Sequence, residues 1–413
     1  MAHPSRYDGG TTGKRIVVHD YSGHPFQAQL SRELARRGHV VEHQYCSSFE
    51  TGHGALQVVD GDPAGFSIRP IPLTREFSKY HPARRVLQEC EYAIKAARAI
   101  RRGRPDIVLL CNVPLVACFL LSRMLRVRGQ RYSFWHQDVY SAAVREAVLR
   151  RSERLGPVLA VVAEAMERSV ACGATRVIAI TDAFGEVYQR WGVQPERVAV
   201  IPNWAPIDEI PMVQGSRAWL ADADELRRFV ALYSGTLGLK HDPNMLLQLA
   251  RSPLLDDCSI VVISQGKGRH WLEERAGGLP PGRLILRDFV PYEQLPEVMA
   301  SADVLITILE PGASRYSVPS KMLSYMCAGR PILAAMSGGN AASQTVIREG
   351  LGIVVDDGAP ETLAASLRKL LDHPDEASSM GKRAREVAER DFALDRIGDR
   401  FEAALGPSPT RGS

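Results

Sequence analysis

The stretch EPGASRYSVPSKMLSYMCAGRP, residues 310–331, decides the fold class of this chain. The apolar run 304–309 comes before it and predicts a buried strand that ends at an acidic residue, Glu310. A glycine-containing loop follows, and Pro319 suits the first turn of a helix. Residues 332–336 then predict a second buried strand. Strand, loop, helix and strand in this order indicate an α/β fold with a parallel sheet.

The start of that helix is a candidate anion site. Its first backbone N–H groups have no partners within the helix, and the helix dipole adds positive potential there. Ser320 and Lys321 stand in the first turn. Glu310, just upstream, offers a carboxylate that can accept hydrogen bonds from hydroxyl groups. A site that binds both phosphate and hydroxyl groups points to a nucleotide-sugar as the ligand.

The length and the strand pattern predict two domains. At 413 residues the chain is too long for one compact core. Strands and helices alternate through residues 1–203, after a polar tail, and again through 229–395, whereas the polar segment 204–228 loses the pattern and is expected to be a linker. Residues 396–413 are expected to form a last helix and a tail that can cross back to the first domain. We therefore predict two Rossmann-like domains that face a central cleft at the carboxyl ends of both sheets.

The composition limits the partners and the compartment. A formal net charge of +4 is too small to indicate nucleic-acid binding. The seven cysteines form no CxxC pair, and no stretch resembles a signal peptide or a transmembrane helix, so a cytoplasmic protein is expected. Arginines cluster in the first domain, at positions 84–85, 101–104, 123–131 and 150–151. They form either solvated helix faces or a basic face that rests on the inner side of an anionic membrane.

Glycine-containing turns follow two predicted strands of the second domain. The turn SGTLGLK, residues 234–240, directly follows an apolar strand and begins with Gly235 and Thr236. Glycine lets the backbone approach a phosphate closely, and Lys240 can supply a positive charge. Gly266 stands at the end of another strand, where a turn can lie near a base or a ribose. Each of these turns can also be an ordinary connection between a strand and a helix.

Two strand ends of the first domain carry candidate residues for the acceptor side. His136 and Asp138 end a strand and would project into the cleft, where His136 could orient an acceptor hydroxyl or contact the transferred sugar. A lone histidine is more often a packed or hydrogen-bonded scaffold residue, and only the position of His136 at a strand end makes the two alternatives about equal. Gly23 and His24 follow the first strand and open the first helix. That position suits a ligand contact and suits a simple turn equally well.

Several other motifs are set aside. Residues 9–15 resemble a phosphate-binding P-loop, but they precede their strand instead of following it. His39 and His43 flank a predicted strand, not a helix, so we expect no metal site there. No GxGxxG motif follows the first strand with an acidic residue about 20 positions on, which argues against a nicotinamide dehydrogenase.

The stretch at residues 310–331 and the turn at residues 234–240, together with IPNW at residues 201–204, resemble the family 4 retaining glycosyltransferases of the GT-B fold. The resemblance covers nearly the whole chain and extends to bacterial exopolysaccharide and O-antigen transferases of the colanic-acid or fucosamine type. It implies transfer of a hexosyl or N-acetylhexosaminyl group from a UDP- or GDP-sugar to a lipid-linked or small-molecule hydroxyl acceptor. It also implies retained anomeric configuration, with neither a metal ion nor another cofactor required.

The chain departs from the family pattern at the donor site. Many members carry two glutamates eight positions apart, and here Tyr316 and Ser324 stand at those positions. Thr236 stands where the family has an arginine beside its phosphate-binding lysine. Lys240 and Lys321 are then left to hold the diphosphate.

We therefore expect a glycosyltransferase of cell-surface polysaccharide or glycolipid assembly. The expected catalytic residues are Lys240, Glu310 and His136, the expected donor-binding residues are Gly235, Thr236, Gly266, Ser320 and Lys321, and the expected acceptor-side residues are Gly23, His24 and Asp138. Two alternatives stay open. One is a nucleotide-sugar 2-epimerase of the same fold, and the other is a non-catalytic nucleotide-sugar-binding subunit.

Overall fold

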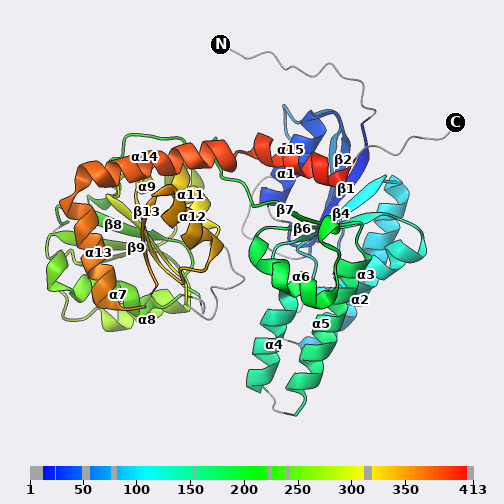
Figure 1. Ribbon diagram of the computed structural model, residues 1–413, viewed down its shortest axis with the longest axis horizontal. Coiled ribbons are helices and arrows are strands. Elements are labelled where there is room, and N and C mark those ends of the chain that lie inside the picture. Colours follow the sequence, from blue (N-terminus) through cyan, green and yellow to red (C-terminus); the bar gives the residue numbers. More distant parts are fainter. Residues whose placement is uncertain are drawn as a thin grey trace. The chain divides into compact units, whose positions relative to one another are not determined.

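Two parallel α/β sheets organise the chain, one of seven strands and one of six (Figure 1). The computed structural model describes residues 13–23, 25–48, 56–75, 81–151, 154–221, 226–238, 241–310, 319–356 and 358–406. The chain divides into two compact units, residues 1–201 with 398–413, and residues 202–397. The predicted α/β class with two Rossmann-like sheets is confirmed.

The first unit contains the seven-stranded sheet, in the order β3-β2-β1-β4-β5-β6-β7. Its strands are β1 (Arg15–Asp20), β2 (Val40–Tyr45), β3 (Phe66–Pro70), β4 (Ile107–Cys111), β5 (Tyr132–His136), β6 (Arg176–Ala179) and β7 (Val198–Val200). Its helices are α1 (Pro25–Arg36), α2 (Pro82–Gly103), α3 (Leu115–Val127), α4 (Tyr140–Arg151), α5 (Gly156–Gly173) and α6 (Gly185–Trp191). Strands β4 and β5 are buried at every position, as the central strands of a sheet covered on both faces should be.

The second unit contains the six-stranded sheet, in the order β10-β9-β8-β11-β12-β13. Its strands are β8 (Phe229–Ser234), β9 (Cys258–Ile263), β10 (Leu284–Arg287), β11 (Val304–Ile308), β12 (Ile332–Ala335) and β13 (Gly352–Val355). Its helices are α7 (Pro243–Arg251), α8 (Lys267–Arg275), α9 (Leu295–Ala300), α11 (Lys321–Cys327), α12 (Ala341–Glu349), α13 (Pro360–Asp372), α14 (Pro374–Asp391) and the start of α15 (Leu394–Leu405).

The sheet of the second unit separates two hydrophobic cores. In β8, Val230 and Leu232 belong to one core, whereas Ala231 and Tyr233 belong to the other. This alternation follows from the two-residue period of a strand, which sends successive side chains to opposite faces. Because both faces are packed, only the ends of the strands are open to a ligand.

The segment 204–228, which we expected to be a linker, packs onto the second unit in its described part. Ala205, Ile210 and Leu220 are buried in one of that unit's two cores. The Ala205 N–H also donates a hydrogen bond to the Phe392 carbonyl at 2.8 Å. The segment lost the strand and helix pattern because it packs in irregular conformation, and not because it is free.

Helix α15 begins in the second unit and ends in the first, because the boundary between the units falls after Ile397. In the first unit, Arg37 donates to Asp399 at 2.6 Å and to Glu402 at 3.1 Å. The ring of Phe401 packs edge-on against Trp135 at 4.9 Å between centroids. The last described residues of the chain therefore complete the first unit.

Candidate functional site

The candidate site lies where the order of strands in the second unit reverses. The chain runs from β8 outward through β9 to β10, and then returns to β11 on the other side of β8. Strands β8 and β11 pair in parallel, so their carboxyl ends lie side by side. Open α/β sheets bind their ligands at this kind of switch point, because the two neighbouring connections leave in opposite directions. Gly235 follows β8, and Glu310 follows β11 as an exposed residue.

Lys321 brings a positive charge to this point. Its Nζ atom lies 3.7 Å from the centroid of the Tyr233 ring and would lie 3.1 Å from a Cβ added at Gly235. The side chain as a whole is half-buried, but Nζ is shielded from solvent and has no hydrogen-bond partner among the described residues. Burial lowers the pKa of Lys321 from 10.5 to about 7. An ammonium that has a ring face but no acceptor among the described residues is costly, and an anionic ligand would relieve that cost.

Tyr325 fixes the position of Lys321. The two residues are four apart on α11 and so lie on the same face of the helix. The buried Tyr325 hydroxyl accepts a hydrogen bond from Ser234 N–H at 2.9 Å and lies 3.1 Å from the carbonyl oxygens of Ser234 and Ile306. It therefore ties α11 to the ends of β8 and β11. Sequence reasoning missed this residue, although a tyrosine one turn after the lysine was a usable signal.

The turn after β8 is held against the turn after β9. Gly235 has a φ of 137°, which strongly favours glycine, and its N–H donates to the Ile263 carbonyl at 2.9 Å. Leu237 N–H donates to Ser264 Oγ at 3.0 Å. Gly266, with a φ of 99°, begins the following helix α8. The structure thus brings the two predicted glycine turns together at one edge of the sheet.

The other predicted donor residues lie at the same edge or outside the described chain. Thr236 is exposed, and its carbonyl accepts a hydrogen bond from the Tyr233 hydroxyl at 3.2 Å. Ser320 is exposed directly before α11, and its side chain does not cap that helix. Helix α11 has seven residues, so the charge of Lys321 is a stronger feature than the helix terminus. Lys240 lies outside the described residues.

Comparison with known families assigns both halves of the chain. Residues 24–204 match the glycosyl transferase 4-like domain, and residues 228–373 match the glycosyl transferases of group 1. The chain belongs to the family 4 glycosyltransferases.

Individual relatives of this glycosyltransferase are distant. WcaI of Escherichia coli, whose name assigns it to colanic acid biosynthesis, is 26% identical over 302 residues, which cover 71% of this chain and 72% of WcaI. Sucrose-phosphate synthase of Thermosynechococcus elongatus superposes with a TM-score of 0.73 at 16% identity, covering 95% of this chain and 98% of that one. Anabaena HepE, solved with UDP and glucose, superposes with a TM-score of 0.69 at 15% identity, covering 95% and 99%. These likenesses confirm the GT-B fold.

In the first unit of the glycosyltransferase, His136 is a scaffold residue, which corrects its predicted catalytic placement. The side chain is fully buried, and its ring nitrogens lie 2.9 Å from the Tyr188 hydroxyl and 3.2 Å from Glu167 Oε1. Glu167 also accepts hydrogen bonds from the backbone N–H groups of Tyr140 and Ser141, each at 2.8 Å. With both nitrogens occupied inside the core, His136 cannot reach an acceptor. The network instead ties β5 to the helices around it.

The predicted acceptor-side residues have different outcomes. Gly23 has a φ of 65°, and a Cβ there would lie 2.9 Å from the Tyr45 ring. The turn and the packing of its own unit therefore require glycine at this position without any ligand. Asp138 is exposed just after the end of β5. His24 lies outside the described residues.

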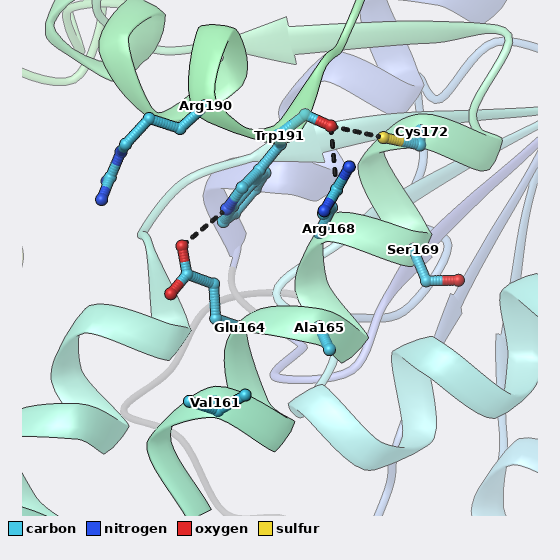
Figure 2. A pocket seen from close by; sticks show the side chains of 8 residues that line it. All are labelled: Val161, Glu164, Ala165, Arg168, Ser169, Cys172, Arg190 and Trp191. Atoms are coloured by element: carbon cyan, nitrogen blue, oxygen red, sulfur yellow. Dashed lines mark hydrogen bonds between the residues drawn. The ribbon is translucent and has the colours of Figure 1, made fainter. Parts of the chain in front are cut away.

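A surface groove of about 530 Å³ lies between α5 and α6 of the first unit (Figure 2). Trp191 Nε1 donates to Glu164 at 3.1 Å, and Arg168 Nε donates to the Trp191 carbonyl at 2.9 Å. Both helices end here, shortly before β6 and β7 begin, so the groove lies toward the amino ends of the strands. It is therefore not a candidate active site in a fold that binds ligands at carboxyl ends.

The described residues contain neither a cluster of metal ligands nor a membrane-spanning helix. No group of three His, Cys, Asp or Glu side chains there could hold a metal ion. No helix in that part of the chain has both the length and the apolar character needed to cross a bilayer.

Proposed function

We propose that this glycosyltransferase moves a sugar from a nucleotide diphosphate-sugar to a hydroxyl acceptor, with retention of the anomeric configuration. The observation that carries the proposal is the buried ammonium of Lys321 at the β8–β11 switch point, for which the described residues supply no acceptor. A diphosphate is the anion that this family of enzymes must hold and release. It would supply the acceptors that Lys321 lacks.

The leaving diphosphate would be stabilised by charge and by backbone groups. Negative charge builds up on the diphosphate as the sugar departs, and a preorganised cation at that point lowers the barrier. Lys321 would provide that cation beside the close backbone approach at Gly235. Lys240 would add a second charge from the turn after β8, and the Ser320 hydroxyl would contact a phosphate oxygen. Thr236 and Gly266 would border the ribose or the base.

Glu310 and the acceptor would contact the sugar end of the donor. The exposed carboxylate of Glu310 follows β11, next to the end of β8, and would accept hydrogen bonds from hydroxyl groups of the transferred sugar. Asp138 would lie on the acceptor side. With His136 inside the core, the departing phosphate is our candidate to take the proton of the acceptor hydroxyl.

Two relatives indicate which donor to test first and which kind of pathway to expect. HepE has been solved in complex with UDP-glucose, which makes a UDP-sugar the first donor to test. WcaI carries a name from colanic acid biosynthesis, which supports a role in polysaccharide or glycolipid assembly. We propose the cytoplasmic side of the membrane as the location of that role. The transferred group would be a hexosyl or an N-acetylhexosaminyl group.

The test combines a donor panel with one substitution. Thermal shift against UDP- and GDP-sugars should identify a stabilising donor, and release of free nucleotide with an acceptor should report turnover. Lys321→Met should then lower kcat/KM by about 10²-fold or more, because it removes leaving-group stabilisation. Lys369→Met, at an exposed lysine on α13, is the matched control and should leave the rate unchanged. Unaltered kinetics in Lys321→Met would show that Lys321 takes no part in catalysis and would overturn the proposal built on it.

A non-catalytic donor-binding subunit is the second candidate, because Ser324 stands where many family members carry a glutamate. Calorimetric binding of a donor without turnover toward any acceptor would favour it. A 2-epimerase would instead interconvert donors without leaving free nucleotide as a stoichiometric product.

A further inference from the structure

Large apolar side chains gather on the outside of the α4–α5 hairpin of the first unit. Six of them, from 41% to 68% exposed, form what we call the hairpin face: Leu149, Leu155, Val158, Leu159, Val161 and Val162. All lie within fourteen consecutive positions of the chain. A water-soluble helix normally turns such residues toward the core. Their concentration in one place marks an interaction surface.

The packing of the hairpin shows that these side chains are not needed in the core of the first unit. At the start of α5, the residues buried against neighbouring helices are Gly156, Ala160 and Ala163. A Cβ at Gly156 would lie 2.7 Å from the Val148 carbonyl of α4, so the two helices approach closely through small residues. The amphipathic order is therefore inverted at this end of α5. Its small residues face the protein, and its valines and leucines face outward.

The hairpin turn projects past the carboxyl edge of the sheet of the first unit. Helix α4 begins directly after β5 ends, and α5 leads back to the start of β6, a parallel neighbour of β5. The turn between the helices is therefore at the far end, about 18 Å beyond the start of α4 for twelve residues of helix. Figure 1 shows the two helices side by side, extending beyond the other helices of that unit.

The net charge around the hairpin face is positive, because residues 145–154 carry four arginines and two glutamates. Arg145 and Arg154 are exposed on either side of the turn, and the sequence places Arg150 and Arg151 at the end of α4. Farther along α5, Arg168 borders the groove with Arg190 of α6 (Figure 2). Residues 1–201 carry 28 Lys and Arg against 19 Asp and Glu, a formal charge of +9, whereas residues 202–413 carry 23 against 28, a charge of −5. The basic excess thus belongs to the unit that carries the hairpin.

We propose that the hairpin face docks on an anionic lipid bilayer as a peripheral contact. Aliphatic side chains flanked by arginines match the boundary between acyl chains and negatively charged headgroups. The face contains no aromatic residue, whereas protein interfaces are enriched in aromatic residues. A symmetric contact between two copies would also bring the same arginines together. This inference concerns attachment and does not depend on the proposed transfer reaction.

Vesicle flotation of the full chain tests the proposal. The protein should float with vesicles of phosphatidylcholine mixed with phosphatidylglycerol, and much less with phosphatidylcholine alone. Val158→Ser/Val161→Ser should weaken binding to the mixed vesicles about tenfold, because it removes inserted apolar surface. Leu254→Ser/Ile347→Ser, which alters two exposed aliphatic residues of the second unit, is the matched control and should bind like the parent.

Two further measurements separate the possible outcomes. The double variant Val158→Ser/Val161→Ser should keep the parent's thermal stability and its affinity for free UDP, which separates docking from failures of folding or donor binding. Equal flotation of that variant and the parent, or no flotation of the parent with mixed vesicles, would overturn the proposal. A parent dimer that this variant converts to monomer would also overturn it, by showing that the face pairs two copies.

Discussion

The two units share one fold but treat the polar side chains at their strand ends differently. In the first unit, His136 at the end of β5 is buried and held by Glu167 and Tyr188. In the second unit, Lys321 beside the end of β8 is held by a ring face and by no hydrogen-bond acceptor among the described residues. A buried polar group whose partners come from its own unit is scaffold. A buried charged group that finds no acceptor among the described residues of its unit is a candidate place for a ligand.

The difference has a local structural cause. In the first unit, the α4–α5 hairpin follows β5 and places Glu167 of α5 next to His136. Burial alone would raise the pKa of Glu167, but the hydrogen bonds from His136 and from Ser141 hold it below its usual range. In the second unit, the short helix α11 is pinned to β8 through Tyr325, and Lys321 Nζ has no hydrogen-bond partner among the described residues. Lys321 keeps its lowered pKa for that reason.

Acidification should unfold the first unit before the second. His19 and His43 are fully buried, and desolvation lowers their pKa to about 4 and about 3. At pH 7 they are neutral whether folded or not, but from about pH 6.5 downward only the unfolded chain gains their protons. At pH 5 this should cost roughly 2 kcal/mol per histidine. The histidines of the second unit are exposed or half-buried: His241, His270 and His373.

Hydrogen exchange at pH 7 and pH 5 measures this difference between the units. Protection in β1, β2 and β4 should fall at pH 5, whereas protection in β8 and β11 should persist. His19→Gln/His43→Gln removes the titrating rings and should lose most of the pH slope. Equal loss of protection in both units would show that the buried histidines do not set the acid limit.

Replacing His136 should cost stability and leave donor binding intact. His136→Phe keeps a ring in the core but leaves Glu167 and Tyr188 short of a partner, at a cost of about 3 kcal/mol. Chemical unfolding would measure the loss, and titration with UDP would report the second unit. A parallel Phe134→Leu variant controls for altered packing without touching the hydrogen bonds. If His136→Phe were fully stable but inactive, the scaffold assignment would be wrong.

Replacing Lys321 should raise the free energy of unfolding, whereas replacing His136 should lower it. Because burial lowers its pKa to about 7, the folded protein without ligand carries the full cost of the buried ammonium below pH 7. That cost shrinks as the pH rises from 7 toward 10.5, where the unfolded chain also loses the proton. Lys321→Met should therefore raise the free energy of unfolding by about 1 kcal/mol at pH 7, and less at pH 9.

Thermal melts with and without UDP give the readout for Lys321→Met. The parent should be stabilised by UDP, and the variant should gain little from it. Lys369→Met serves again as the control and should melt like the parent. A variant less stable than the parent without ligand would mean that Lys321 already has a partner and is scaffold too.

Much of the fold could be read from the sequence because the strands are short apolar runs. The expected strand at 304–309 corresponds to β11, and the one at 332–336 corresponds to β12. The strand ends also place Gly235, Gly266 and Lys321 at one edge of one sheet. Helix α4 was not expected, because its twelve residues carry three arginines and show no apolar stripe toward a core.

The parts of the site that could not be predicted depend on partners that are distant in the sequence. His136 looked accessible at its strand end, but its acceptor, Glu167, is 31 residues away. Tyr325 matters because its hydroxyl meets Ser234, 91 residues away. Short-range patterns place residues on elements, whereas burial and hydrogen bonding of a side chain depend on which elements pack together.

The shared helix α15 affects the order in which the protein can fold during synthesis. Residues 202–397 leave the ribosome before residues 398–406, which cover Trp135 and pair with Arg37. All residues of the second unit are therefore synthesised before the first unit has all of its own. The first unit, although its first 201 residues are translated earliest, needs residues 398–406 before its surface is complete.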